Sequence, residues 1–184
     1  MPKGDILIHA GDFTWSGREQ PTLDFLDWLE AQSFKHKILV SGNHDFYFEH
    51  GKNLRQLEGR SIHYLMNNEI AIEGQIKVWG SPFTPEFMDW AFMGTPKERE
   101  ALWAKIPEHL DILITHGPPL GVLDRAADGV NAGCPYLLKS VQSKLANERF
   151  VANAKPEVVA VEKKKQSDAE QKIKTLEEQL STLK

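Results

Sequence analysis

The stretch "SGNHDFYF", residues 41–48, decides how the rest of the chain is interpreted. It follows the apolar run "KILV" (37–40), so a glycine, an amide, an imidazole and a carboxylate come directly after a predicted buried strand. Two other apolar runs end similarly: "DILIHA" (5–10) leads into Gly11-Asp12, and "DILIT" (111–115) into His116-Gly117. Ligands bind at the carboxyl ends of strands in α/β domains, so these three strand ends predict one site at one edge of a sheet.

Helical patterns alternate with the strand patterns along the chain. Residues 20–32 place apolar side chains on one face of a predicted helix, a second helix begins at Pro96, and a third covers 135–148. The run "EIAIEGQIKVWGSP" (69–82) alternates on both sides of a Glu-Gly pair and predicts a hairpin. Shorter strands are predicted at 61–65 and 155–162. Strands alternating with helices predict an α/β layered domain.

Composition and charge limit the function classes. With 184 residues, the chain is long enough for one domain with an appendage, and its formal net charge of −4 predicts no nucleic-acid partner and no anionic membrane. A single cysteine, Cys134, excludes an internal disulfide and suits a reducing compartment. No apolar run approaches the roughly 20 residues of a membrane span, and the first residues show no signal-peptide pattern. We therefore expect a cytoplasmic protein.

The composition changes near residue 162, which divides the chain into a domain at 1–161 and a tail at 162–184. The tail has no glycine, proline or aromatic residue, and its apolar residues alternate spacings of four and three: Ala169, Ile173, Leu176, Leu180 and Leu183. This is the a/d pattern of a coiled coil, over only about two heptads. We favour a solvated helical tail, and self-association through a coiled coil is the alternative.

The residues at the three strand ends are potential metal ligands. Asp12 supplies a carboxylate that can bridge two cations, Asn43 an amide carbonyl and His116 an imidazole. Mixed oxygen and nitrogen ligation suits Mn, Fe or Zn better than Ca, and two-metal hydrolases activate water for attack on phosphorus. His44 would then contact phosphate or protonate the leaving oxygen, and Asp45 would orient that imidazole.

Each of these residues also has a structural interpretation. Gly-Asp after a strand is often a turn, and Asn-His-Asp can form an Asx-turn. The metal-site hypothesis depends on the conjunction of three strand ends rather than on any one residue. The other candidates are interpreted as structural: His9 as a sheet residue, and four tryptophans as packing residues, with Trp79 as a possible border of a pocket. These tryptophans are Trp15, Trp79, Trp90 and Trp103.

The motifs "GDFTWSG", "GNHD" and "ITHGPPLG", in this order, resemble those of calcineurin-like metallophosphoesterases, and in particular of the metallophosphoesterase-domain-containing branch. The resemblance runs from Gly4 to Val161. It implies a sandwich of two mixed sheets flanked by helices, a centre of one or two divalent metals, and phosphomonoester or phosphodiester substrates such as cyclic nucleotides. It also implies that Asp12 bridges the metals, that Asn43 and His116 hold the second metal, and that His44 is the catalytic imidazole.

The sequence departs from the family pattern at both ends. The family's first strand, which ends in Asp-x-His, has no counterpart before Gly4, and no Gly-His-x-His follows "KPEVVAV" (155–161). The domain thus lacks its first strand and one histidine for each metal, so we expect exposed sheet edges and apolar surface. Either the chain is a truncated or misassembled gene product with a foreign tail, or it is a degenerate paralogue. We favour the first explanation because the interior motifs are intact.

These observations predict a metal-dependent phosphoesterase that is weak or inactive in this form. The alternative is a catalytically dead pseudoenzyme that acts as a binding or scaffold protein through its helical tail.

Overall fold

The computed structural model describes residues 3–145, and its elements follow the predicted order closely. The strands are β1 (Ile6–His9), β2 (His36–Leu39), β3 (Ile62–Tyr64), β4 (Asn68–Ile72), β5 (Ile76–Ser81), β6 (Thr84–Pro85), β7 (Met93–Gly94) and β8 (Ile112–Thr115). The helices are α1 (Glu19–Glu30), α2 (Pro96–Trp103) and α3 (Pro135–Leu145), with short 3₁₀ turns η1 (Phe46–Gly51) and η2 (Leu54–Leu57). The strand predicted at 155–162 and the predicted tail lie outside the described residues.

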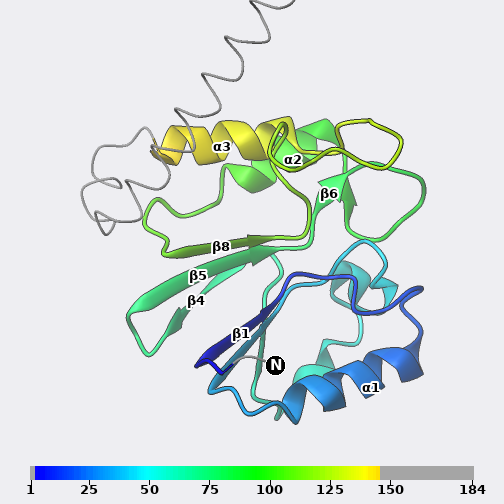
Figure 1. The fold of residues 1–184 in the computed structure, drawn as a ribbon, viewed down its shortest axis with the longest axis vertical. Coiled ribbons are helices and arrows are strands. Elements are labelled where there is room, and N and C mark those ends of the chain that lie inside the picture. The colour runs from blue at the N-terminus through cyan, green and yellow to red at the C-terminus, as the bar shows by residue number, and fades with distance from the viewer. Residues whose placement is uncertain (1–2, 146–184) are drawn as a thin grey trace, which may run out of the picture. The chain divides into compact units, whose positions relative to one another are not determined.

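The described strands form two three-stranded sheets and one short pair (Figure 1). In the first sheet, β2 lies between β1 and β3, and both pairings are parallel. In the second, β5 pairs antiparallel with β4, as the hairpin pattern predicts, and parallel with β8. The second sheet is therefore mixed, as the family resemblance implies, whereas the first is parallel over its described strands. The α/β class is confirmed.

Alternation along β2 explains how the sheets and helices are layered. Ile38 and Val40 pack against Val78 of β5 and Ile114 of β8, in a core between the two sheets. Leu39 points the other way and packs in a second core with Leu26 and Leu29 of α1. On the outer side of the second sheet, a third core joins Trp79 to residues of α2 and α3 (Figure 1).

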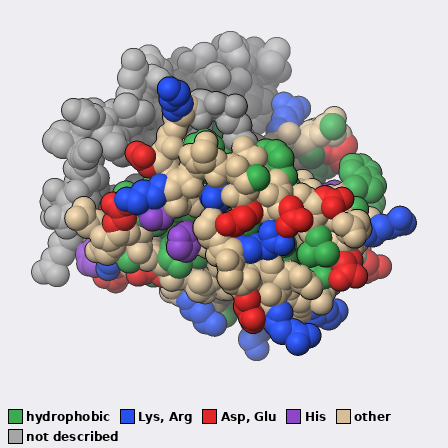
Figure 2. All heavy atoms as spheres, turned by 90° about the horizontal axis from the view of Figure 1, so that it is seen from below, with side chains coloured by type: hydrophobic (Ala, Val, Ile, Leu, Met, Phe, Trp, Pro, Cys, Tyr) green, Lys and Arg blue, Asp and Glu red, His purple; other side chains and the backbone are tan. Residues whose placement is uncertain are grey.

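Strand β1 is an edge strand in the described sheet and pairs only with β2 there. Its Ile8 is among the exposed large hydrophobic residues of the described chain. The face shown in Figure 2 intersperses acidic and basic side chains and shows no large patch of one sign. Among the described helices, none has the length and apolar character that crossing a membrane requires.

Candidate active site

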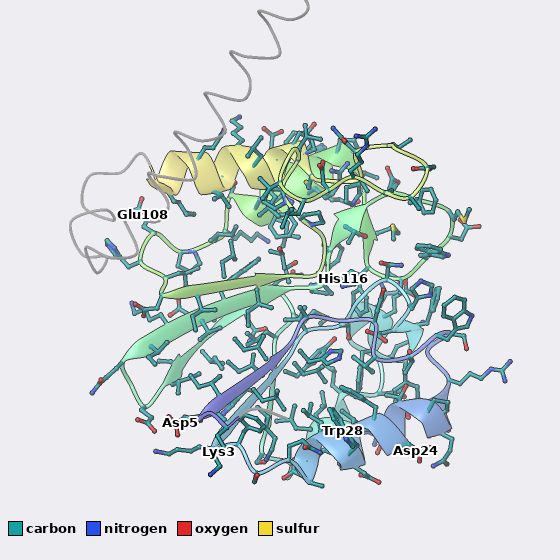
Figure 3. All side chains as sticks on the ribbon, in the orientation of Figure 1. Lys3, Asp5, Asp24, Trp28, Glu108 and His116 are labelled. Carbon is teal, nitrogen blue, oxygen red and sulfur yellow. The ribbon has the colours of Figure 1, made fainter. Side chains whose placement is uncertain are left out.

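Three predicted ligands meet at the carboxyl ends of β1, β2 and β8. The Nε2 atom of His116 lies 2.8 Å from Oδ1 of Asn43 and 3.5 Å from Oδ1 of Asp12. His116 is largely buried at the end of β8, where Figure 3 labels it. Residues separated by up to about a hundred positions in the sequence therefore converge on one point, as their positions at three strand ends predict.

Two glycines allow this close approach. A Cβ atom on Gly11 would lie 2.5 Å from Nδ1 of His116, and a Cβ atom on Gly42 would collide with the Asp12 carboxylate. Gly11 also has a φ of +106°, which a residue with a side chain rarely adopts. Asp12 itself has a φ of 57°, a strained conformation for a non-glycine residue. The strand-end loops meet because Gly11 and Gly42 carry no side chain.

The hydrogen bonds of His116 define the chemistry of this point. Nδ1 lies 2.8 Å from the carbonyl oxygen of Ala10, so Nδ1 carries a proton and donates it. In the neutral imidazole, Nε2 then keeps a lone pair, and this lone pair faces the side-chain oxygens of Asn43 and Asp12. A cation bound between these side chains would accept the lone pairs of His116 and Asn43 and would neutralise the Asp12 carboxylate.

The remaining polar groups are consistent with a cation at this point. Nδ2 of Asn43 is buried and has no hydrogen-bond partner in the described structure, an arrangement that usually has a functional reason. Residues 3–145 contain no cluster of three or more His, Cys, Asp or Glu side chains that would hold a metal by themselves. The fit therefore depends on Asn43 as the third donor, and the set of one nitrogen and two oxygens matches the ligation of one divalent cation.

Asp45 has a different position from the one predicted. It is 0 % exposed, and its Oδ2 accepts hydrogen bonds from the backbone N–H groups of Asp12 (2.8 Å) and Gly42 (2.7 Å). Its Oδ1 accepts from the backbone N–H and the hydroxyl of Thr14. Burial raises the pKa of Asp45, although the four hydrogen bonds act in the opposite direction. The expectation that Asp45 orients the His44 imidazole is wrong, because its carboxylate joins two strand-end loops instead.

The His44 imidazole is held by a carbonyl group. Nδ1 lies 2.9 Å from the backbone oxygen of Trp15, so Nδ1 donates and Nε2 is left to accept or release a proton. The backbone N–H of His44 donates to Oδ1 of Asp12 at 3.0 Å, which places the imidazole next to the predicted ligands. The arrangement suits general acid–base chemistry beside a cation.

Two tryptophans flank the His44 ring. The Trp15 ring stacks on it with centroids 5.2 Å apart, and the Trp90 ring lies 4.6 Å away. The packing interpretation is confirmed for Trp79 and Trp103, which are buried, and it is wrong for Trp15, which is 85 % exposed. Trp79 is buried in the core that also contains Trp103. Trp15 follows Asp12 by three residues, which is weak sequence evidence that it lies near the site. Nothing in the sequence connects Trp90 with the site.

The protein-family comparison agrees with this geometry. The model of the calcineurin-like phosphoesterases matches residues 1–153, which cover most of the chain. The chain belongs to the calcineurin-like phosphoesterase family. Family membership confirms the predicted resemblance and supports a metal-dependent phosphoesterase at the level of the family, whose members generally use divalent metals.

The curated proteins that resemble this chain belong to two different families, which match different parts of it. Metallophosphoesterase domain-containing protein 1 of Homo sapiens is 37 % identical over 172 residues, and its Mus musculus counterpart gives the same values. The alignment covers 79 % of this chain and 52 % of each relative, so the chain spans about half of their length. Residues 135–184 match a different model, the tRNA-binding arm of valyl-tRNA synthetase. Valine–tRNA ligase of Christiangramia forsetii is 59 % identical over 46 residues, which are 25 % of this chain and 5 % of that protein.

Proposed function

We propose that this chain hydrolyses phosphomonoesters or phosphodiesters with a divalent cation held by Asp12, Asn43 and His116. The observation that carries the proposal is the meeting of the Asp12, Asn43 and His116 side chains at one point at the strand ends. Nitrogen and oxygen ligation favours Mn, Fe or Zn. These residues supply ligands for one cation, and a second cation, bridged by Asp12, would need ligands from outside this set.

In the proposed reaction, the residues of the site would have separate roles. A bound divalent cation supplies a water of lowered pKa and neutralises charge on the phosphoryl oxygens. As water attacks phosphorus and the bond to the leaving oxygen breaks, protonated His44 gives its Nε2 proton to that oxygen. The Nδ1–H of His44 stays bonded to the Trp15 carbonyl, which keeps the ring in one orientation throughout the step. Asp45 holds the loops of Asp12 and Gly42 in register.

Hydrolysis of bis(4-nitrophenyl) phosphate in the presence of Mn²⁺ tests the proposal. We expect His44→Ala to lower kcat by roughly 100-fold or more while calorimetric Mn²⁺ binding is retained, because His44 moves a proton and is no ligand. We expect His116→Ala to lose both activity and Mn²⁺ binding. The control is His50→Ala, whose side chain is 76 % exposed. Unchanged Mn²⁺ binding in His116→Ala would contradict the proposed ligand set.

A second candidate function belongs to the end of the chain. Residues 135–184 resemble a tRNA-binding arm, and they contain ten Lys and Arg residues against seven Asp and Glu. Residues 1–134 contain twelve against nineteen, so the net charge of the whole chain conceals two regions of opposite sign. A basic segment of this kind favours an RNA partner, and it gives the binding-protein alternative a concrete ligand class.

Filter binding of unmodified tRNA to the full chain at two salt concentrations tests this candidate. We expect affinity that falls as salt rises, and a loss of affinity when Lys163, Lys164 and Lys165 are changed to Gln. The matched control changes three lysines of the first region, Lys52, Lys77 and Lys105, to Gln. Equal losses in the two triple variants would point to non-specific charge attraction and would contradict a role for the segment 135–184.

Self-association through the predicted coiled coil is a separate proposal about partners. Sedimentation of the full chain is compared with that of a variant in which Leu176 and Leu180 are changed to Lys. A lower mass in the variant is the result expected for a coiled coil, because both positions belong to the predicted apolar seam. An identical mass would exclude it.

A further inference from the structure

Three aromatic rings lie around His44, and we call them the aromatic face: Trp15, Phe87 and Trp90. The Trp15 and His44 planes differ by 22°, so the two rings are stacked, and Phe87 meets Trp90 edge to face at 5.1 Å. Trp15 is 85 % exposed and Phe87 54 % exposed, although both are large apolar side chains. One side of the Trp15 ring contacts His44, so most of the remaining ring surface meets solvent.

The segment that carries Phe87 and Trp90 is anchored to the site. The backbone N–H of Ala91 donates to the carbonyl of Asn43 at 3.0 Å, and the N–H of Thr84 donates to the carbonyl of Phe92 at 3.0 Å. Ala91 and Phe92 are buried in the core beside α1. These hydrogen bonds and the burial of Ala91 and Phe92 therefore fix the backbone that carries the Phe87 and Trp90 rings.

The backbone of this segment is also strained. Met88 and Phe92 have φ values of 53° and 55°, which non-glycine residues seldom adopt. Such conformations persist only where the surrounding structure imposes them, and they often accompany binding or catalysis. The strain therefore supports a functional reason for holding Phe87 in solvent and Trp90 against His44.

The position of His44 identifies what would cover the aromatic face. In the proposed reaction the leaving oxygen receives its proton from His44, so the organic group on that oxygen lies beside the rings that flank the imidazole. A flat ring can stack on an indole, whereas a saturated chain makes a poorer contact. The exposed carboxylates of Glu86 and Asp89 are in the same segment, and they disfavour a second anionic group on the ligand.

We propose that the aromatic face selects phosphoesters whose leaving group carries a flat, uncharged ring, with that ring stacked on Trp15. The inference rests on the proposed function, because it takes the phosphoryl group to lie between His44 and the three acceptor side chains. It assigns Trp15 as a specificity-determining residue and leaves the chemical step to His44.

The test compares binding of phenylphosphonate and methylphosphonate by calorimetry in the presence of Mn²⁺. We expect the full chain to prefer phenylphosphonate, and we expect Trp15→Ala to reduce that preference roughly tenfold, with part of it kept in Trp15→Phe. The matched control is Trp28→Ala: Trp28 is 46 % exposed and lies on α1, well away from His116 (Figure 3). A second readout is the NMR signal of the Trp15 indole N–H, which should shift with phenylphosphonate and not with methylphosphonate.

The outcomes separate this inference from the proposed function. An equal phenyl-to-methyl ratio in the wild type and in Trp15→Ala overturns the aromatic face as a specificity site, while binding of both compounds leaves the proposed function standing. If neither phosphonate binds, both proposals fail. If Trp28→Ala changes the ratio as much as Trp15→Ala does, the preference reflects general apolar attraction, and the inference is again overturned.

Discussion

Two neighbouring regions at the strand ends are built in opposite ways. The polar rim, which comprises residues 11–14, residues 42–45 and His116, is tied together by hydrogen bonds to Asp45 and by side chains that meet across two glycines. The aromatic face beside it presents rings to solvent. The loops of the rim are joined by internal hydrogen bonds, whereas the face leaves apolar surface uncovered. The comparison suggests that the rim is preorganised for chemistry and the face is complementary to something outside the chain.

The largest expected effect comes from breaking the rim at Gly42. A Cβ in Gly42→Ala would collide with the Asp12 carboxylate and lie 2.5 Å from the backbone nitrogen of Asp12. We expect a loss of about 3 kcal/mol in the free energy of unfolding, measured by urea denaturation, and loss of Mn²⁺ binding. Gly4→Ala is the control, since its Cβ would meet only ordinary contacts with the Phe34 ring. A Gly42→Ala protein of wild-type stability would contradict the geometry of the rim.

Asp45→Asn tests the rim at its centre with almost no change in shape. Each carboxylate oxygen accepts two hydrogen bonds, so either orientation of the new amide places an NH₂ group against two donors. We expect a loss of roughly 2–3 kcal/mol by urea denaturation, because buried donors are left without acceptors. Asp128→Asn should change stability by less than about 0.5 kcal/mol, since Asp128 is exposed and accepts one bond. Equal effects of the two changes would show that the Asp45 network is not what joins the loops.

A smaller effect on stability is expected when the pH is lowered. Burial lowers the pKa of His9 below its ordinary value, although the Asp45 and Asp12 carboxylates raise it and His116 lowers it further. The unfolded chain therefore takes up this proton first as the pH falls, so stability is complete above the ordinary histidine pKa and declines below it. Protonation also removes the acceptor that receives the Gly11 N–H.

We expect the Tm of the wild type to fall between pH 7 and pH 5, and we expect the Tm of His9→Gln to fall less over the same range. The control is His50→Gln, whose exposed side chain makes no comparable contact. His63, whose pKa burial also lowers, remains in both variants and accounts for part of the remaining slope. A pH profile of His9→Gln that matches the wild type would exclude His9 as a source of the acid sensitivity.

The smallest effect is expected on the aromatic face. Phe87→Ala should change the free energy of unfolding by less than about 0.5 kcal/mol, because more than half of the side chain is exposed. Phe48→Ala, at a fully buried ring in the core beside α1, should cost about 3–5 kcal/mol. The difference between the two unfolding free energies tests whether the aromatic face contributes to stability, because a face that contributes little has another reason to be held in place. A large loss in Phe87→Ala would assign that ring to the fold.

The sequence predicted the strand-end residues for a definite physical reason. An apolar run followed by Gly-Asp, Gly-Asn-His-Asp or His-Gly predicts a buried strand with polar side chains at its end. The convergence of Asp12, Asn43 and His116 could therefore be predicted from the sequence. The same reasoning assigned Asp45 to the wrong partner, because adjacency in the sequence does not fix which way a side chain points. Pattern rules also missed β6 and β7, which have only two residues each and carry no periodicity.

The whole-chain net charge conceals a contrast between two regions of the chain. It averages an acidic region, residues 1–134, with a basic one, residues 135–184, and the two regions resemble different proteins. Electrostatic attraction depends on local charge within about a Debye length of roughly 8–10 Å, so a sum over the chain conceals it. A count for each segment would have shown the contrast.

Residue types alone predicted the α/β order of the elements, the polar residues at the strand ends and the family. These features are local, since they follow from hydrophobic periodicity and from residue types within a few positions of one another. Three features depend on the packing of distant segments: Asp45 joins the loops, Trp15 is exposed, and the side chains of Asp12, Asn43 and His116 meet at one point. Those features depend on which distant segments pack together and on the space that two glycines leave between them, and short-range sequence patterns carry no information on either.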